Sequence, residues 1–490
     1  MNDFSFDSPS RQSSKGIIVI FGVSLYKFIK RVAIFFLIFF VRFVDVYATK
    51  VILGACIGVL FFIAYSLLKY VNFKFYVTED YFILHQGILN KEETSIAKTK
   101  IQNVYIKQNF IQQLINVVSL SIETAGDNKT EIEIQALTVA KANALKRVLL
   151  ENRAQEQYET TKNDGSLYYK VSIKKLLLEG VSENHFRSFI FILFFIIGLY
   201  NDFKDFLESL NIKTRFDGYF AFSDTEILSL LIFNFALVFV LLFIAFLFSL
   251  IKTFLENFNL KVTSTNKGLE ISKGLFNKVS LVLEPNRIQN TIVKTNRLKQ
   301  WLGLYKLNFT QAMVNKKQQK HFTIIGLNKF KVDELIQKFY PNIFSSVVKL
   351  KPEKYFIYRS TLSYIIVLAL LNLIFSFISV ELFLINIPFV IFASLSIIYS
   401  YKKAYYSIDE NYLIVGSGKL VDINTNFLEL HKVQGVALKQ TIFQKRRTLA
   451  SVMVYSSTNA VTIPHIKEEN AKSIIDFLLF KIESSKKDWM

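Results

Sequence analysis

The sequence has very little of the chemistry that metalloproteins and secreted proteins use. Its 490 residues include one cysteine, Cys56, five histidines and six prolines. One thiol cannot form a disulfide within the chain or a cysteine-rich zinc site. The histidines are scattered and lack the spacing of metal ligands. We therefore expect no metal and no cofactor, and a reducing cytosol suits the soluble parts of the chain.

The motifs that identify common enzymes are also missing from the sequence. It contains no Walker-type phosphate loop, no G-x-G-x-x-G after a strand, no H-E-x-x-H and no G-x-S-x-G. The N-terminal stretch MNDFSFDSPSRQSSKG lacks the basic and apolar regions of a cleaved signal peptide. The missing enzyme motifs predict no catalytic residues and no enzymatic activity.

Apolar and basic residues are abundant instead. Hydrophobic residues make up 51% of the chain, phenylalanine alone contributes 49 residues, and the net charge is +20. This composition exceeds the apolar level of soluble proteins and indicates a membrane protein. Its basic residues lie mainly beside apolar runs, which favours the anionic lipids of an inner leaflet as partners and argues against nucleic acid.

Six apolar stretches, arranged in three pairs, predict transmembrane helices. They are Ile29 to Phe43, Val51 to Leu68, Phe186 to Tyr200, Ile227 to Ile251, Thr361 to Val380 and Phe383 to Tyr399. Two connections within pairs are short, and the third, Asn201 to Glu226, is acidic, whereas the other helix ends are basic. By the positive-inside rule the basic ends are cytoplasmic. We therefore expect a multi-pass protein of the inner membrane with both termini and all soluble domains in the cytoplasm.

A Gly-Val-Ser triplet recurs just before the first and second pairs. It occupies Gly22 to Ser24 in one place and Gly180 to Ser182 in the other, each time after a short apolar cluster. This pattern predicts an amphipathic segment that lies in the membrane interface and leads into a spanning helix, with a plain linker as the alternative.

One motif occurs three times in the chain. It reads KIQNVYIKQNF from Lys100, RIQNTIVKTNR from Arg287 and KVQGVALKQTI from Lys432. Aligned on the glutamines Gln102, Gln289 and Gln434, the segments also share an earlier glycine at Gly87, Gly274 and Gly418. Such fixed self-similarity predicts three copies of one domain, here called copies 1, 2 and 3.

Each copy combines a β pattern with a closing helix. Strands such as VSLSIET and TEIEIQA alternate apolar and polar residues, and LTVAKANALKRVLLENR ends copy 1 with helical spacing. We expect six or seven antiparallel strands capped by one C-terminal helix. The predicted parts are 1–72 (N-terminal segment and hairpin 1), 73–154 (copy 1), 155–258 (interfacial segment and hairpin 2), 259–341 (copy 2), 342–403 (hairpin 3) and 404–490 (copy 3).

The order of hairpin, glycine turn and motif resembles the bacterial pleckstrin-homology-like membrane proteins (bPH2). Copy 1 carries the resemblance best, in GILNKEETSIAKTKIQNVYIKQNFIQQLINVVSLSIETAG. Copy 2 keeps GLF, RIQN and WLGLYKLNFT, while copy 3 keeps KVQG and departs in its strands. The resemblance implies three pleckstrin-homology-like β-rolls, each of two sheets and a capping helix. It also implies membership of a complex in envelope maintenance or stress response.

Recurring bases are the candidate contacts for lipid or partner. They precede the motif glutamine by two residues, follow it by five, or lie on nearby turns, and they are Lys100, Lys107, Arg287, Lys294, Lys316, Lys317, Lys432, Lys439, Lys445, Arg446 and Arg447. The alternative is a solvated surface without a specific ligand. We interpret the three glutamines as structural, because an amide can satisfy backbone groups at a strand entry or bulge.

The sequence favours a non-enzymatic scaffold or interaction module anchored in the membrane. Its partners would be anionic lipids and other membrane proteins or further copies of itself. The alternative function is lipid or solute handling, in which six helices form a path that the soluble domains gate. The apolar character of the spans weighs against an aqueous path.

Overall fold

A computed structural model describes most of the chain as two compact units. The described residues are 6–124, 132–150, 166–185, 188–192, 227–265, 268–312, 319–344, 348–378, 383 and 386–484. Their first unit falls within 1–169, 260–287 and 311–322, and the second within 170–259, 288–310 and 323–490. Copy 2 is thus divided, because its first strands belong to the first unit and its later strands to the second.

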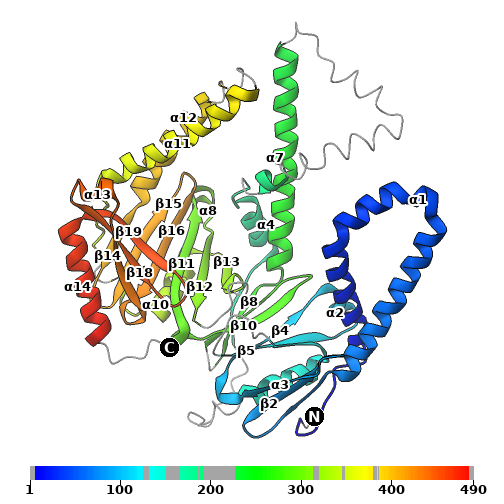
Figure 1. The fold of residues 1–490 in the computed structure, drawn as a ribbon. Coiled ribbons are helices and arrows are strands. Elements are labelled where there is room, and N and C mark those ends of the chain that lie inside the picture. The colour runs from blue at the N-terminus through cyan, green and yellow to red at the C-terminus, as the bar shows by residue number, and fades with distance from the viewer. Residues whose placement is uncertain are drawn as a thin grey trace. The chain divides into compact units, whose positions relative to one another are not determined.

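The first unit begins with a long helix that returns to its starting point. Helix α1 (Gly16–Asn72) has 57 residues and would span about 85 Å if it were straight. Instead, the Tyr70 hydroxyl donates a hydrogen bond of 3.4 Å to the carbonyl of Gln12. The rings of Phe28 and Phe62 also lie 5.0 Å apart. The helix therefore bends back on itself, as Figure 1 shows, in agreement with a hairpin in this part of the chain.

The described part of the chain contains two helices long and apolar enough to cross a membrane. They are Val238–Asn257 within α7 (Ile227–Asn257) and Tyr355–Leu373 within α11 (Tyr355–Ile378). Helix α12 (Asn386–Lys403) follows α11, and Gly16–Phe28 and Cys56–Asn72 are shorter apolar helical segments. Most of the predicted span at residues 186–200 and its acidic connection lie outside the described residues. Six transmembrane helices therefore remain a prediction.

Copy 1 forms a β-roll with a capping helix in the first unit. Its elements are β1 (Lys74–Val77), β2 (Tyr81–Gln86), β3 (Glu92–Ala97), β4 (Ile101–Gln108), β5 (Val118–Thr124), β6 (Ile132–Leu137) and α3 (Val139–Leu150). Alternating side chains such as Phe75, Phe82, Leu120 and Ile134 meet Leu145 of α3 in one buried core. Alternation holds in β1 and β2, whereas β5 is buried on both faces, because Ser119, Ser121 and Glu123 are buried beside its apolar residues.

Copy 3 repeats this arrangement in the second unit. It contains β14 (Tyr405–Ile408), β15 (Tyr412–Gly418), β16 (Asp422–Glu429), β17 (Gly435–Lys439), β18 (Leu449–Tyr455), β19 (Ala460–Lys467) and α14 (Glu468–Ser484). Its core joins Leu413, Val452 and Ile463 to Leu478 of the capping helix. Copies 1 and 3 therefore fit the predicted pleckstrin-homology-like roll.

Copy 2 contributes three strands to each unit. In the first unit lie β8 (Lys261–Thr265), β9 (Gly268–Lys273) and β10 (Lys278–Leu283), preceded by β7 (Ser166–Lys170). In the second unit lie β11 (Ile288–Asn296), β12 (Tyr305–Gln311), β13 (Thr323–Leu327) and the helix α10 (Lys329–Phe339). The same set of strands and helix is therefore present in all three copies.

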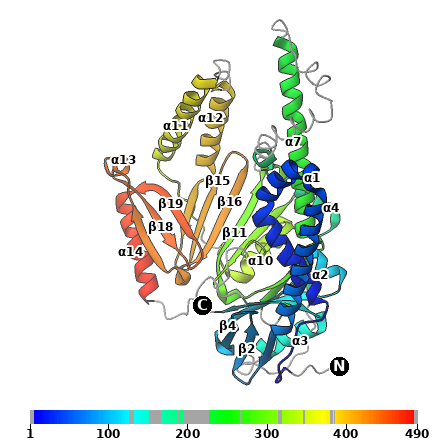
Figure 2. The same ribbon diagram turned by 45° about the vertical axis from the view of Figure 1, so that its right-hand side comes forward.

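Strand pairing joins successive copies (Figures 1 and 2). In the first unit β4 of copy 1 pairs antiparallel with β10 of copy 2, within the sheet order β6-β5-β4-β10-β9-β8-β7. In the second unit β11 of copy 2 pairs antiparallel with β16 of copy 3, within the order β13-β12-β11-β16-β15-β14. The strand that carries the motif is therefore the strand that binds the next copy.

Both junctions have the same register. Ile106 lies opposite Ser280 in the first, and Val293 lies opposite Thr425 in the second. Ile106 and Val293 each follow their motif glutamine by four residues, and Ser280 and Thr425 each precede theirs by nine. Strand register is set by the pattern of facing side chains, so its repetition shows one rule of assembly used twice.

Candidate functional site at the tip helices

Each copy has a short helix directly after its motif strand. These tip helices are α2 (Phe110–Leu114), α8 (Arg297–Trp301) and α13 (Ile442–Lys445), and each begins eight residues after the motif glutamine. The preceding residue is Asn109, Asn296 or Thr441, whose side chain accepts a hydrogen bond from the third backbone N–H of the helix. A side-chain cap of this kind explains why such a short segment is helical.

The tip helices expose large apolar side chains. Leu114 is 71% exposed, Trp301 is 82% exposed and Ile442 is 73% exposed, with Phe110 and Phe443 also exposed beside them. Single exposed apolar residues are ordinary, but here they recur at one place in all three copies. Apolar residues grouped at a loop tip are typical of a surface that contacts lipid or a partner.

In the second unit, basic residues near the tip helices lie against aromatic residues of the apolar helices α11 and α12. The guanidinium of Arg447 stands 4.7 Å from the ring centre of Tyr358 and 5.2 Å from that of Tyr355, at the start of α11. Arg297 of α8 stands 4.3 Å from the ring centre of Tyr399 in α12. Tyrosines with adjacent cations are characteristic of the membrane–water interface.

In the first unit, the start of α1 packs beside the tip helix α2. The Lys15 ammonium donates a hydrogen bond of 3.1 Å to the carbonyl of Ile115, just after α2. Val19 of α1 is buried against Val117. The first predicted interfacial segment is therefore docked on copy 1 at its tip.

The predicted bases that precede the motif glutamine do not gather in one patch. Lys100 is exposed on a short 3₁₀ turn. Arg287 forms an ion pair of 3.0 Å with Glu284 and donates a hydrogen bond of 3.2 Å to Asn103. Lys432 is buried and forms an ion pair of 2.6 Å with Glu429. Arg287 and Lys432 therefore have structural partners within their own units.

The predicted bases that follow the glutamine by five lie on the motif strands. Lys107 faces Val279 across the first junction, and its ammonium lies 4.7 Å from the ring centre of Tyr105. Lys294 faces Asn424 across the second junction, and burial together with the nearby Lys306 lowers its pKa. Lys439 is exposed on β17. These three lysines thus occupy one register position in different surroundings.

The remaining predicted bases belong to turns. Lys445, Arg446 and Arg447 are exposed at the end of tip helix α13, so they are the predicted bases that the structure brings together. Lys316 and Lys317 lie outside the described residues. The motif glutamines differ as well, since Gln289 is fully buried, Gln434 is exposed, and the register of β4 shifts between Ile101 and Asn103.

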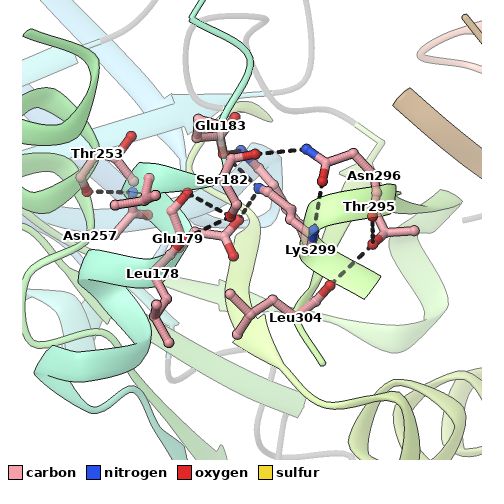
Figure 3. Close-up of polar contacts among 12 residues, drawn as sticks. Leu178, Glu179, Ser182, Glu183, Thr253, Asn257, Thr295, Asn296, Lys299 and Leu304 are labelled. Atoms are coloured by element: carbon pink, nitrogen blue, oxygen red, sulfur yellow. Dashed lines mark hydrogen bonds and ion pairs between the residues drawn. The ribbon is translucent and has the colours of Figure 1, made fainter. Parts of the chain in front are cut away.

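A buried cluster of charges holds the tip helix of copy 2 (Figure 3). Lys299 of α8 pairs with Glu179 of α4 (Ile173–Val181), and its ammonium also lies 3.0 Å from a carboxylate oxygen of Glu183. Lys306 of β12 contacts the same oxygen of Glu183 at 3.4 Å. Glu179 is fully buried and Lys299 is almost so. The cluster thus ties α4 to the tip helix and the sheet of copy 2.

Burial raises the pKa of these carboxyl groups, whereas pairing with lysines lowers it. Burial raises the pKa of Glu179 above its ordinary value, against the attraction of Lys299. Burial also acts on Glu183, but Lys306 and Lys299 outweigh it and lower its pKa to about 2. The two glutamates keep Lys299 charged, since their attraction raises its pKa despite its own burial. The cluster therefore contains one carboxylate held firmly ionised and one that burial penalises.

Helix α4 also lies against α7, which contains a candidate span. A Cβ atom added at Gly180 would stand 3.3 Å from the Cα atom of Leu250. Such a contact is tighter than most Cβ atoms make, so a side chain here would require Leu250 to shift, and glycine suits the close approach of the two backbones. At the C-terminal end of α4, Asn296 donates a hydrogen bond of 2.7 Å to the carbonyl of Ser182. The Gly-Val-Ser triplet therefore connects a candidate span to the tip helix.

Copies 1 and 3 use an uncharged residue where copy 2 has Lys299. Gln112 donates hydrogen bonds to Ser119 (2.6 Å) and to the carbonyl of Gln135 (2.5 Å). Gln444 bonds to Ser451 (3.0 Å) and to Nδ1 of His465 (2.8 Å). The three residues all follow the motif glutamine by ten. That recurrence is the sequence signal of an anchoring position, and the predicted site residues do not include it.

The titratable groups that anchor the tip helices of copies 2 and 3 are paired. Within the described ranges no group of three or more His, Cys, Asp or Glu side chains could hold a metal ion. Burial lowers the pKa of His465, which serves Gln444, and lowers the pKa of His321 to about 4. What the site presents is apolar tips, basic turns and buried polar anchors.

Comparison with known proteins agrees with the threefold pattern. The family model for the bacterial PH domain matches at residues 29–153, 209–342 and 362–480. The UPF0699 transmembrane protein YdbT of Bacillus subtilis (strain 168) is 25% identical over 475 residues, which cover 90% of this chain and 93% of that protein. No solved structure matches the chain. The matches confirm the predicted resemblance and its three copies, and neither name denotes an enzyme.

Proposed function

Because the chain belongs to the bacterial PH domain family, we propose that it is a non-enzymatic scaffold that presents three PH-like domains at the cytoplasmic face of the inner membrane. The observation that carries this proposal is the pairing of successive copies through β4–β10 and β11–β16. Independent modules on separate hairpins would not share sheets. Within each unit, copies tied by backbone hydrogen bonds present a continuous sheet, which suits the holding of partners.

The tip helices would rest in the head-group region of the inner leaflet. Their apolar residues supply insertion, and bases such as Lys445, Arg446 and Arg447 supply attraction to anionic lipids, at about 1 kcal/mol for each base near the surface. The stacking of Arg447 and Arg297 on tyrosines of α11 and α12 supports this placement.

Tryptophan fluorescence tests the lipid contact directly. The chain has two tryptophans, so Trp489→Phe leaves Trp301 of the tip helix α8 as the single reporter. In liposomes with brominated lipids, we expect blue-shifted emission and strong quenching of Trp301. The matched control, Trp301→Phe, reports the C-terminal tryptophan alone. Emission from Trp301 at the wavelength of a fully hydrated indole would overturn the lipid contact.

Purification from native membranes tests the scaffold. The tagged full chain should retain a defined set of membrane proteins after mild crosslinking, and a variant with Ile442→Ser and Phe443→Ser should retain fewer of them. Retention of none would overturn the scaffold. Flux of lipid or solute through the purified protein in liposomes, together with that loss, would favour the alternative function of lipid or solute handling.

A further inference from the structure

In the described part of the chain, the pairing between successive copies leaves one edge strand at each end of the series that is not paired with another copy. In the part of the chain that the structure describes, β3 of copy 1 pairs only with β2, and β17 of copy 3 pairs only with β18. Strand β3 is the counterpart of β10 and β16, while β17 is the counterpart of β4 and β11. Each end therefore carries the complementary half of a junction that the chain already forms twice.

Applying the shared register to these two edges gives definite pairs. Residues that follow the motif glutamine by four lie opposite residues that precede the next glutamine by nine, in both internal junctions. The same offset places Leu438 of β17 opposite Glu93 of β3 and Lys439 opposite Glu92. The register between β17 and β3 is therefore fixed by that of the two internal junctions.

The charges on the two edges are complementary. Glu92 and Glu93 are exposed on β3, whereas Lys439 is exposed on β17, with the bases of α13 nearby. Like charges keep two β3 edges, or two β17 edges, from pairing with each other, and opposite charges directly across a pair of strands are favourable. The charges therefore select the unlike pair, β17 with β3.

The apolar contacts of the first internal junction are also available at the ends. In that junction the rings of Phe110 and Phe276 lie 5.2 Å apart, and Gln113 donates hydrogen bonds to the carbonyls of Leu275 and Phe276. By the same offsets, Ile442 replaces Phe110 and Leu89 replaces Phe276. Leu89 is fully exposed and Ile442 is 73% exposed, whereas their counterparts Phe276 and Phe110 are only partly exposed, at 44% and 51%.

We propose that β17 of one molecule pairs antiparallel with β3 of a second copy of this chain, in the register of the internal junctions. The contact is head-to-tail, so it joins molecules into a ring or an open row rather than a two-fold dimer. Each internal junction joins copies that carry their own membrane segments, so a further junction of the same geometry keeps every molecule in one membrane. This assembly goes beyond the proposed scaffold, because it requires no other partner.

Cysteine crosslinking in native membranes tests the register. In a Cys56→Ser background, the double variant Glu93→Cys/Leu438→Cys should form intermolecular disulfides under mild oxidation and yield a ladder of dimers, trimers and larger species. Directly opposite residues of antiparallel strands lie within disulfide reach. Each single variant should remain monomeric, and the two co-expressed should give the dimer only.

Two control pairs make a negative result meaningful. Ile106→Cys/Ser280→Cys probes the equivalent pair of the internal junction and should form an intrachain disulfide under the same conditions. Glu93→Cys/Lys439→Cys is shifted by one residue, so its side chains point to opposite faces of the sheet, and its yield should be at least several-fold lower. Lys439→Glu should reduce the ladder, and adding Glu92→Lys should restore it.

Three results would overturn the proposal. The internal control could form its bridge while the Glu93/Leu438 pair forms none. The Glu93/Leu438 bridge could form within a single chain. The Glu93→Cys variant alone could crosslink to a different protein, which would make β3 a docking edge for that protein instead. The first two results leave lipid contact and partner retention untouched, and the third would support partner retention while removing self-assembly, so failure here is distinguishable from failure of the proposed function.

Discussion

The tip helices of copies 1 and 2 occupy the same place but are held by different chemistry. In copy 1, Gln112 satisfies its amide with Ser119 and the carbonyl of Gln135, both in the same β-roll. In copy 2, Lys299 lies at that position and reaches out to Glu179 and Glu183. A neutral amide can be satisfied locally, whereas a buried ammonium requires carboxylates. The tip of copy 2 therefore depends on α4, and through Gly180 on α7, while the tip of copy 1 does not.

Removing the charge of copy 2 should have the largest effect on stability. Lys299→Ala leaves Glu179 buried without its cation, which should lower the free energy of unfolding by about 3–5 kcal/mol. Urea titration of the detergent-solubilised protein measures it. The double variant Glu179→Gln/Lys299→Gln should recover part of the loss, because two amides can bond to each other. A loss below about 1 kcal/mol for Lys299→Ala would contradict a buried ion pair.

Removing the amide of copy 1 or copy 3 should cost less. Gln112→Ala or Gln444→Ala leaves buried polar partners unsatisfied, at about 1–3 kcal/mol. The same titration applies, and limited proteolysis near α2 or α13 should increase. If these variants proved as costly as Lys299→Ala, the contrast between local and external anchoring would not hold.

A smaller and pH-dependent effect is expected at Glu183. Its pKa is lowered to about 2 from 4.5, so its contribution to stability is present above pH 4.5 and is lost as the pH falls toward 2. Glu183→Gln should cost about 1 kcal/mol at neutral pH, since the carboxylate is partly exposed and accepts bonds from two lysines. The gap between wild type and variant should close in acid. The pKa of Glu179 is raised, so its contribution to stability changes with pH in the opposite direction. Glu179 is present in both wild type and variant, so the comparison between them reports on Glu183.

An exposed ion pair should show the smallest effect. Lys331 and Glu334 on α10 lie 2.9 Å apart but are partly open to solvent. Lys331→Ala should change the free energy of unfolding by about 0.5 kcal/mol or less, because solvent and salt screen such pairs. This variant removes a lysine–glutamate pair from the same copy, so it isolates burial as the cause of the Lys299 effect.

Local patterns were enough to predict the elements of each copy but not the pairing between copies. Alternation in VSLSIET and TEIEIQA predicted β5 and β6, and helical spacing predicted α3. The pairing of Ile106 with Ser280 joins residues from different copies, and no short-range signal marks such a contact. The boundaries of the three domains stay a prediction, and the sharing of sheets means that copy 2 is divided between the units.

The role of the candidate site residues stays a prediction. The bases of the α13 turn are exposed side by side, whereas Arg287 and Lys432 have ion-pair partners inside the fold. Charge at a recurring position does not reveal exposure, because a lysine such as Lys432 can be buried when a carboxylate three residues away pairs with it. The sequence did not predict the tip helices, because four or five residues are too few to show a helical period.

The constant register at the junctions makes the number of copies adjustable. Since β10 and β16 meet their partners by the same offsets, β4 of copy 1 could accept β16 of copy 3 with Ile106 opposite Thr425. A gene that lost its middle third would still encode matching edges, and one that gained a fourth unit would extend the series. The number of domain copies can therefore change by duplication or deletion, because the existing interface joins any two successive copies.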